Sequence, residues 1–311
     1  MKHMKREALR SMLKCFKRII ALLLCAVLLT ACAPASDNGE TTVETTAAVK
    51  GEIPESVSVL FLGNSFSVDT LEYAFKLLSA FGVKEIKIGK MIIGGCSINK
   101  HYENATQDLP KYDYSYFGTD GTFAYSDRRI SETLTLQEWD WVFIQHGTGD
   151  GSRYANEYSY SKLEDLVKYI KETAGENTKV GFNMTWVGEP GSSPELASTF
   201  GNDQIAYFNA ICQLTSTLVA NTPGIDMVTP TGTGIQNART TDIGILTRDN
   251  YHLNQVPGRY IAALTFIAAL TGMDISNAKP LGGITDEQLA IAIAAAQAAV
   301  ANPYQITDIS K

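Results

Sequence analysis

Asp249 and His252 lie three residues apart in the segment RDNYHLN at positions 248–254, and the chain has only four histidines. A carboxylate can hold an imidazole in one tautomer through Nδ1–H, which leaves Nε2 free to take a proton from a nucleophile. Positions three apart can face the same way on one helical turn. A polar surface turn would show the same spacing. The pair therefore indicates a catalytic site only if the chain also provides a nucleophile elsewhere.

A candidate nucleophile is Ser65, which follows the apolar run VSVLFL at residues 57–62. The run predicts a strand buried on both faces. A serine shortly after such a strand would stand at the carboxyl edge of the sheet. If a helix follows, its first amides favour a negative charge at this place. A strand-to-helix turn capped by a serine would have the same composition.

Two other predicted strand ends offer hydrogen-bond donors to a developing oxyanion. Gly94 and Gly95 follow a strand predicted near residues 85–93, and glycines allow close approach to an unshielded N–H. A plain tight turn is the alternative. Gln145 ends the third predicted strand, where its side-chain amide could donate. The glycines within residues 147–151 lack a following Lys-Ser or Lys-Thr, which argues against a phosphate-binding loop.

Three further side chains, Asn64, His146 and Trp186, are candidates for contact with a substrate. Asn64 precedes the candidate nucleophile. His146 would point to the opposite side of its strand from Gln145, so a structural role is its first interpretation. Trp186 could form the wall of a pocket, although an aromatic residue at a strand end more often belongs to the core.

The elements that would position these residues alternate along the chain. Strands are predicted at 57–62, 85–93, 141–145, 179–185 and 225–229, and helices at 71–81, 160–173, 202–220, 257–271 and 284–301. Segment 102–135 is less regular and could hold a hairpin or an insertion. The alternation predicts an α/β fold, a three-layer αβα sandwich around a five-stranded parallel sheet. Ligands bind such sheets outside the carboxyl ends of the strands, where the candidate residues fall.

The first 31 residues predict an export signal. A basic segment precedes the apolar run IIALLLCAVLL, which is shorter than the about 20 residues of a membrane-spanning helix. The run ends in Leu-Thr-Ala-Cys, which resembles a bacterial lipobox and makes Cys32 the predicted lipidation site. An ordinary signal peptide or a membrane anchor is the alternative. Residues 32–55, poor in large apolar groups, predict a flexible tether, and residues 56–311 predict one folded domain.

Without residues 1–31 the chain has 19 Lys and Arg against 32 Asp and Glu, a net charge near −13. This balance argues against nucleic acid as a partner and against charge-driven adhesion to anionic lipid, so the acyl group would form the membrane anchor. Cys96 and Cys212 are too few for a disulfide scaffold, and the sequence does not indicate whether they pair. No cysteine or histidine spacing indicates a zinc site.

Together these segments resemble the SGNH or GDSL hydrolase superfamily of serine esterases over about residues 57–271. The segments that carry the resemblance are Gly63-Asn64-Ser65-Phe66-Ser67, Gly94-Gly95-Cys96-Ser97 and Asp249-Asn250-Tyr251-His252. The order Ser, Asp, His along the chain is also that of the family. The resemblance implies a flavodoxin-like fold, a triad of Ser65, His252 and Asp249, an oxyanion hole that includes the N–H groups of Ser65 and Gly95, and no metal or organic cofactor.

The chain departs from the third block of the family, which is usually Gly-x-Asn-Asp. Here the corresponding segment is Gly147-Thr148-Gly149-Asp150, with glycine in place of the asparagine that donates to the oxyanion. Either Gln145 supplies the third donor or the hole has two. Loss of one donor raises the barrier by about 3 kcal/mol, which slows an enzyme without abolishing its activity.

The activity that the resemblance implies is that of a serine esterase, and the expected substrate is a small acyl ester, in the first place acetyl, on a carbohydrate. The tyrosines of segment 102–125 and Trp186 could present aromatic faces to sugar rings, and no long apolar lid indicates a lipase. The expected partners are an acylated small molecule or glycan, and a membrane through the lipid anchor. The alternative is a surface lipoprotein that binds a glycan or peptide with little or no turnover. The sequence leaves the oligomeric state open.

Overall fold

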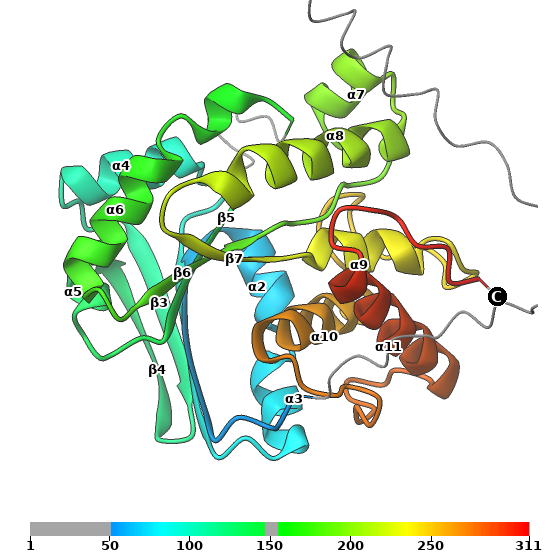
Figure 1. Ribbon diagram of the computed structural model, residues 1–311, viewed down its shortest axis with the longest axis horizontal. Helices are drawn as coiled ribbons and strands as arrows, with labels where there is room; N and C mark the ends of the chain where they lie inside the picture. Colours follow the sequence, from blue (N-terminus) through cyan, green and yellow to red (C-terminus); the bar gives the residue numbers. More distant parts are fainter. Residues whose placement is uncertain (1–50, 147–154, 311) are drawn as a thin grey trace, which may run out of the picture. The chain divides into compact units, whose positions relative to one another are not determined.

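The computed structural model of the protein describes residues 51–146 and 155–310 (Figure 1). These residues form a seven-stranded sheet in the order β4-β3-β2-β1-β5-β6-β7. The strands are β1 (Ser56–Gly63), β2 (Glu85–Ile92), β3 (Tyr112–Gly118), β4 (Gly121–Arg128), β5 (Trp141–Gln145), β6 (Lys179–Asn183) and β7 (Ile225–Thr229). The predicted signal, Cys32 and the segment at 147–150 lie outside the described residues.

Five of the strands correspond to the five predicted from the sequence. β2, β1, β5, β6 and β7 pair in parallel with one another. Counted among themselves they have the order 2-1-3-4-5, which is the flavodoxin-like arrangement. β3 and β4 form an antiparallel hairpin that extends the sheet beyond β2. The predicted fold class is confirmed, and the irregular segment 102–135 contains a hairpin.

Helices cover both faces of the sheet (Figure 1). They are α2 (Ser65–Leu71), α3 (Ala74–Phe81), α4 (Ile98–Thr106), α5 (Ile130–Leu134), α6 (Leu163–Ala174), α7 (Pro194–Phe200), α8 (Gln204–Thr217), α9 (Thr231–Ala238), α10 (Gly258–Thr271) and α11 (Asp286–Ala301). α4, α5 and α6 pack together on one side, whereas α2, α3, α9, α10 and α11 pack together on the other. Within the described part of the chain, no helix is long and apolar enough to span a bilayer.

β1 is the middle strand of the seven-stranded sheet, between β2 and β5, and is buried from its second residue onward. Its side chains alternate between two cores: Val59 and Phe61 pack beneath α2 and α10, whereas Leu60 and Leu62 face the α4–α6 side. This explains why the strand has apolar residues at nearly every position. It also fixes the strand end, and therefore Ser65, on a rigid element.

The helix predicted at residues 71–81 is in fact two helices, and the first begins at Ser65. The predicted start at residue 71 is wrong because the side chain of Asn64 caps the helix earlier in the chain, by accepting a hydrogen bond from the N–H of Phe66. Asp69 is fully buried on one side of α2. As a result, the candidate nucleophile occupies the first position of a helix.

Candidate active site

Ser65, His252 and Asp249 form a continuous series of hydrogen bonds at the carboxyl edge of the sheet. The Ser65 Oγ lies 2.8 Å from His252 Nε2, and His252 Nδ1 lies 2.8 Å from Asp249 Oδ2. The serine follows β1, whereas the other two come from the loop that precedes α10, 187 positions later. The structure therefore brings together the three residues that the sequence suggested, in the geometry of a nucleophile, a base and an orienting acid.

The loop that carries Asp249 and His252 is a tight turn, not the helical turn that their spacing suggested. An isolated bridge between Thr247 and Leu253 closes it, and Asn250 adopts a left-handed backbone with φ of 64°. Asp249 Oδ1 accepts the N–H of His252 at 2.7 Å and that of the intervening Tyr251 at 3.1 Å. Asp and Asn favour such turns because their short side chains hydrogen-bond to nearby backbone amides.

Asp249 is an ionised carboxylate at all ordinary pH values. Desolvation opposes ionisation, but the backbone N–H and imidazole of His252 and the backbone N–H of Tyr251 outweigh it and lower the pKa of Asp249 to about 2. The Asp249 side chain is 49% exposed and that of His252 is 25% exposed. The acid and the base of the series are thus reachable from solvent.

Asn64 connects the ends of three strands. Its Oδ1 accepts hydrogen bonds from the N–H of Phe66 at 3.0 Å and from Gln145 Nε2 at 2.7 Å. Its Nδ2 donates to the carbonyl of His146 at 3.0 Å and to that of Cys96 at 3.3 Å. The side chain is fully buried. The expectation that Asn64 contacts substrate is therefore corrected: it holds the loops after β1, β2 and β5 together.

Two backbone N–H groups, those of Ser65 and Gly95, are the candidates for binding an oxyanion. The N–H of Ser65 is the first amide of α2, and a first helical amide has no carbonyl acceptor one turn earlier. Gly95 lies in the turn after β2 and has a left-handed backbone with φ of 64°. The carbonyl of the next residue, Cys96, accepts a hydrogen bond from the Asn64 side chain. Gln145 is fully buried and its amide donates to Asn64. Gln145 thus orients Asn64 in this structure, and its role as an oxyanion donor stays a prediction.

His146 and Trp186 are both buried, as their structural and core interpretations predicted, so the alternative of substrate contact is corrected for both. His146 Nε2 lies 3.1 Å from the hydroxyl of Tyr160, and burial lowers the pKa of His146 to about 3. Trp186 donates from Nε1 to the carbonyl of Tyr251 at 2.9 Å and packs against Phe66. The tryptophan therefore supports the turn that carries His252.

Asp69 is a functional candidate that the sequence reasoning missed. It lies four positions after Ser65 in α2, with its side chain 1% exposed. It accepts the N–H of Leu253 at 2.8 Å and pairs with Arg248 at 3.2 Å and Arg259 at 2.7 Å. These contacts tie the nucleophile helix to the residues on both sides of His252. The signal that could have found it is an acid one helical turn after the serine.

A second ion pair supports the same turn from the β6 side. Arg239 Nη2 pairs with Glu189 at 2.7 Å, with both side chains mostly buried. The backbone N–H of Glu189 donates to the carbonyl of Asn250 at 2.7 Å. The segment after β6 and the turn at 248–252 therefore hold each other in place. In the part of the chain that the structure describes, no cluster of three or more His, Cys, Asp or Glu could hold a metal ion.

Fold and site together define a flavodoxin-like α/β protein with a Ser-His-Asp series at the carboxyl edge of its sheet. Residues 58–299 match the family described as "Domain of unknown function (DUF4886)", and the chain belongs to this family. The chain is similar to a crystallised DUF4886 family protein from Bacteroides uniformis ATCC 8492. That structure has 32% sequence identity and a TM-score of 0.76, and the alignment covers 82% of this chain and 98% of the other.

Two more distant structures share 16% and 14% identity with the chain. One is a putative GDSL-like lipase from Parabacteroides merdae ATCC 43184, with a TM-score of 0.44 over 72% of this chain and 99% of the other. The other is the periplasmic domain of a lipopolysaccharide acetyltransferase from Salmonella ser. Paratyphi A, with a TM-score of 0.42 over 70% of this chain and 84% of the other. Likenesses at this level carry no weight for activity or substrate. A search of curated proteins gave no match.

Proposed function

We propose that the protein is a serine ester hydrolase of the SGNH type. The observation that carries the proposal is the unbroken series from Ser65 Oγ through the His252 imidazole to the Asp249 carboxylate, with 2.8 Å at each step. A capped helix terminus or a surface turn would not need both ring nitrogens of one histidine engaged in this way. The sequence blocks that resemble the superfamily provide the three members in the expected chain order.

In the proposed reaction, Ser65 Oγ attacks the ester carbonyl while its proton passes to His252 Nε2. The Asp249 carboxylate stabilises the imidazolium that forms. The N–H groups of Ser65 and Gly95 bind the oxyanion of the tetrahedral intermediate. Collapse breaks the carbon–oxygen bond to the alcohol, which leaves with the proton from His252. Water then attacks the acyl-serine by the same route, which releases the acid and restores Ser65.

For the substrate we propose a small acyl group, acetyl in the first place, on a carbohydrate. The exposure of Asp249 and His252 supports this, because an open site admits a bulky hydrophilic alcohol. Of the aromatic residues that suggested sugar binding, Trp186 and the tyrosines of β3 are buried and do not support it, whereas Tyr125 of β4 is 53% exposed. The openness of the site is therefore the main support for a sugar.

The test is labelling of the protein with a fluorophosphonate probe, beside Ser65→Ala and His252→Ala. We expect wild type to react, and both variants to lose the label while keeping their folded far-ultraviolet spectrum. Acetate release from an acetylated glycan, with the same variants as controls, then tests the substrate. A folded wild type that neither labels nor releases acetate would contradict the proposal. Glycan binding by such a sample would favour the alternative, a binding protein without turnover.

We also propose that the protein is exported and anchored by lipid at Cys32. The support is the basic segment, the short apolar run and the lipobox-like Leu-Thr-Ala-Cys in the sequence. Feeding cells a clickable palmitate analogue should label the wild type, and Cys32→Ala should remove the label and release the protein from the membrane fraction. Labelling that persists in Cys32→Ala would contradict the assignment of the anchor.

A further inference from the structure

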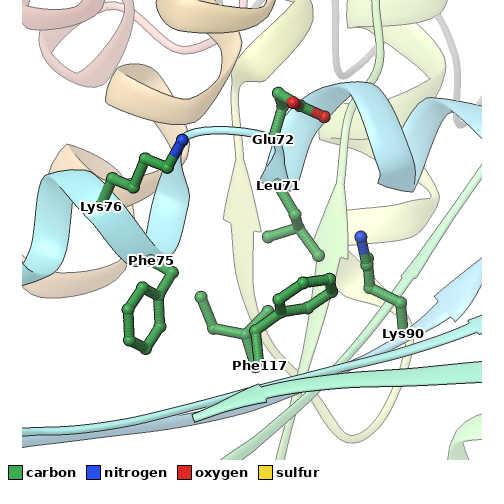
Figure 2. A pocket seen from close by; sticks show the side chains of 7 residues that line it. Leu71, Glu72, Phe75, Lys76, Lys90 and Phe117 are labelled. Atoms are coloured by element: carbon green, nitrogen blue, oxygen red, sulfur yellow. The ribbon is translucent and has the colours of Figure 1, made fainter. Parts of the chain in front are cut away.

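A pocket of about 210 Å³ lies between the sheet and helices α2 and α3 (Figure 2). The residues that line it are Leu71, Glu72, Phe75, Lys76, Ile88, Lys90 and Phe117. A cavity of this volume holds several water molecules, so a small ligand fits. Leu71 lies six residues along α2 from Ser65, about 9 Å at the helical rise. The pocket is therefore separate from the Ser-His-Asp series.

The body of the pocket is apolar. Leu71 and Ile88 are buried on the wall side, and Phe75 projects from α3 into the same space as Phe117 from β3 (Figure 2). The Phe117 side chain is 37% exposed although it lies on an inward-facing position next to Ile88. Such walls favour a ligand that replaces water with an apolar group.

One charged group, Lys90, extends into this apolar space. It comes from β2, two residues after Ile88, and its ammonium lies 4.7 Å from the centre of the Phe117 ring. Among residues 51–146 and 155–310, no carboxylate forms an ion pair with it. Burial lowers the pKa of Lys90; nearby Glu72 opposes this effect and Arg259 adds to it. A cation that has lost part of its hydration without gaining a counterion favours an anion.

Glu72, the acid of the pocket wall, is already engaged elsewhere. Its carboxylate pairs with Arg259 Nη1 at 3.1 Å and accepts a hydrogen bond from Gln255 at 3.0 Å. Lys76 is exposed at the rim (Figure 2) and adds positive charge at the entrance. The local balance therefore leaves one positive charge at the apolar wall and a second at the opening.

We propose that this pocket binds a small amphipathic carboxylate, with its tail against Leu71, Phe75 and Phe117 and its carboxylate on the Lys90 ammonium. One ammonium matches one negative charge, and the volume limits the tail to a few carbons. The apolar walls exclude strongly hydrated di- and trianions, which would lose more hydration than one ammonium restores. The site does not depend on the proposed esterase activity.

The test is calorimetric titration of the protein with hexanoate, beside 1-hexanol, hexylammonium and acetate. We expect saturable binding of hexanoate at one site. The other three compounds should bind more weakly or not at all, because 1-hexanol lacks the charge, hexylammonium has the opposite charge and acetate lacks the tail. Lys90→Met keeps the apolar stem and removes the charge, so it should weaken hexanoate binding by about tenfold or more. Lys90→Arg should retain most of the affinity.

Two control variants make the assignment specific. Lys87→Met removes a lysine from the same strand whose side chain points to the opposite face of the sheet, and it should leave hexanoate binding unchanged. Ser65→Ala should also leave it unchanged, because the pocket is separate from the serine. The proposal is overturned if millimolar hexanoate shows no saturable binding, if Lys90→Met binds as tightly as wild type, or if Ser65→Ala abolishes binding.

Discussion

The hydrogen bonds of Asp249 determine which nitrogen of His252 faces the serine. A carboxylate accepts from Nδ1–H and leaves Nε2 without a proton, as the Ser65 contact requires. In Asp249→Asn the side-chain NH₂ can donate to Nδ1, which favours the tautomer with the proton on Nε2. We expect kcat for p-nitrophenyl acetate to fall on the order of 10⁴-fold.

The same variant should remain folded, because Asp249 and His252 are partly exposed and lie in a surface turn. Urea unfolding provides the control: the free energy of unfolding should change by less than about 1 kcal/mol. A kcat within tenfold of wild type would mean that Asp249 does not set the tautomer, and would remove it from the proposed triad.

Asp69 offers a second prediction at the residue scale. Asp69→Asn leaves Arg248 and Arg259 without their shared buried carboxylate and weakens the bond to the Leu253 N–H. Breaking a buried ion pair costs about 3–5 kcal/mol of stability, and the turn that carries His252 should loosen. We expect a lower kcat and slower fluorophosphonate labelling, with KM little changed, because Asp69 positions the base without contacting substrate.

A merely structural role for Asp69 would lower stability without slowing the chemistry. Ile170→Ala is the matched control, because Ile170 is fully buried on the α6 side of the sheet and its truncation costs about 2–5 kcal/mol. At a temperature where both variants are folded, only Asp69→Asn should label slowly. Equal labelling rates in the two variants would contradict the positioning role.

The sequence could indicate Ser65, Asp249 and His252 because each lies in a short local pattern. The spacing of Asp69 from Ser65 could have suggested it, but its ion pair could not be found in this way, because Arg248 is 179 positions away and only the fold brings them together. The bond between Gln145 and Asn64 was missed for the same reason. Their positions at strand ends were correct, but local sequence does not show that their side chains bond to each other in the interior.

At the scale of elements, Asn64 links the strand ends on which the site depends. In Asn64→Ala, α2 loses its cap, and the amide of Gln145 and the carbonyl of His146 lose buried partners. A lost cap costs about 0.5–2 kcal/mol and each unsatisfied buried group about 1–3 kcal/mol. We therefore expect the free energy of unfolding to fall by several kcal/mol, measured by urea denaturation.

Asn64→Asp is the informative companion variant. It keeps an acceptor for Phe66 and Gln145 but removes the donor to the carbonyls of Cys96 and His146. Its stability should lie below that of wild type, and fluorophosphonate labelling should slow because the Gly95 turn is no longer held beside Ser65. Wild-type labelling by Asn64→Asp would show that Asn64 does not hold this turn.

β1, β5 and β6 were predictable because each is a mostly buried apolar run, and α3 and α6 were predictable from their periodicity. α9 was not, because its sequence TGTGIQNA has low helix propensity. Packing overrides that propensity: every residue of α9 is buried, and Gly232 lies where a Cβ would come within 2.2 Å of the carbonyl oxygen of Thr185. The glycine is required by close approach of the backbone, which no local pattern reveals.

Gly232→Ala tests this account. Alanine raises helix propensity by about 1 kcal/mol, so propensity alone predicts a more stable protein. The clash with a backbone oxygen predicts the opposite, a net loss of about 1–3 kcal/mol. Gly94→Ala is the control, because a Cβ there meets nothing within 4 Å and unfolding should change by less than about 0.5 kcal/mol. A stabilised Gly232→Ala would contradict the packing explanation.

At the scale of the whole molecule, two buried neutral histidines connect the stability of the fold to pH. His101 faces Cys96 and Tyr112, with Nδ1 at 2.9 Å from the tyrosine hydroxyl, and His146 faces Tyr160. Burial lowers the pKa of each histidine to about 3. His101 lies in α4, and His146 lies at the carboxyl edge of the sheet, directly after β5. Protonation of either histidine therefore destabilises the native packing and not only the candidate site.

The sign of the effect follows from proton uptake. An unfolded histidine takes a proton near pH 6.5, whereas these two stay neutral in the fold until about pH 3. Their contribution to stability is therefore complete above about pH 6.5 and is lost as the pH falls toward 3. Each histidine can lower the free energy of unfolding by up to about 1.4 kcal/mol per pH unit within this window.

Urea unfolding at several pH values between about 6.5 and 5, above the range where carboxylates titrate, should show this slope directly. His101→Gln and His146→Gln should each reduce the slope of unfolding free energy against pH by the contribution of one proton. This holds even if the variant is less stable overall, because the slope depends only on the difference in bound protons between the unfolded and folded states. A free energy of unfolding that does not change across this interval would mean that both histidines take protons within the fold. The interior around α4 and the end of β5 would then have to admit water or rearrange below neutral pH.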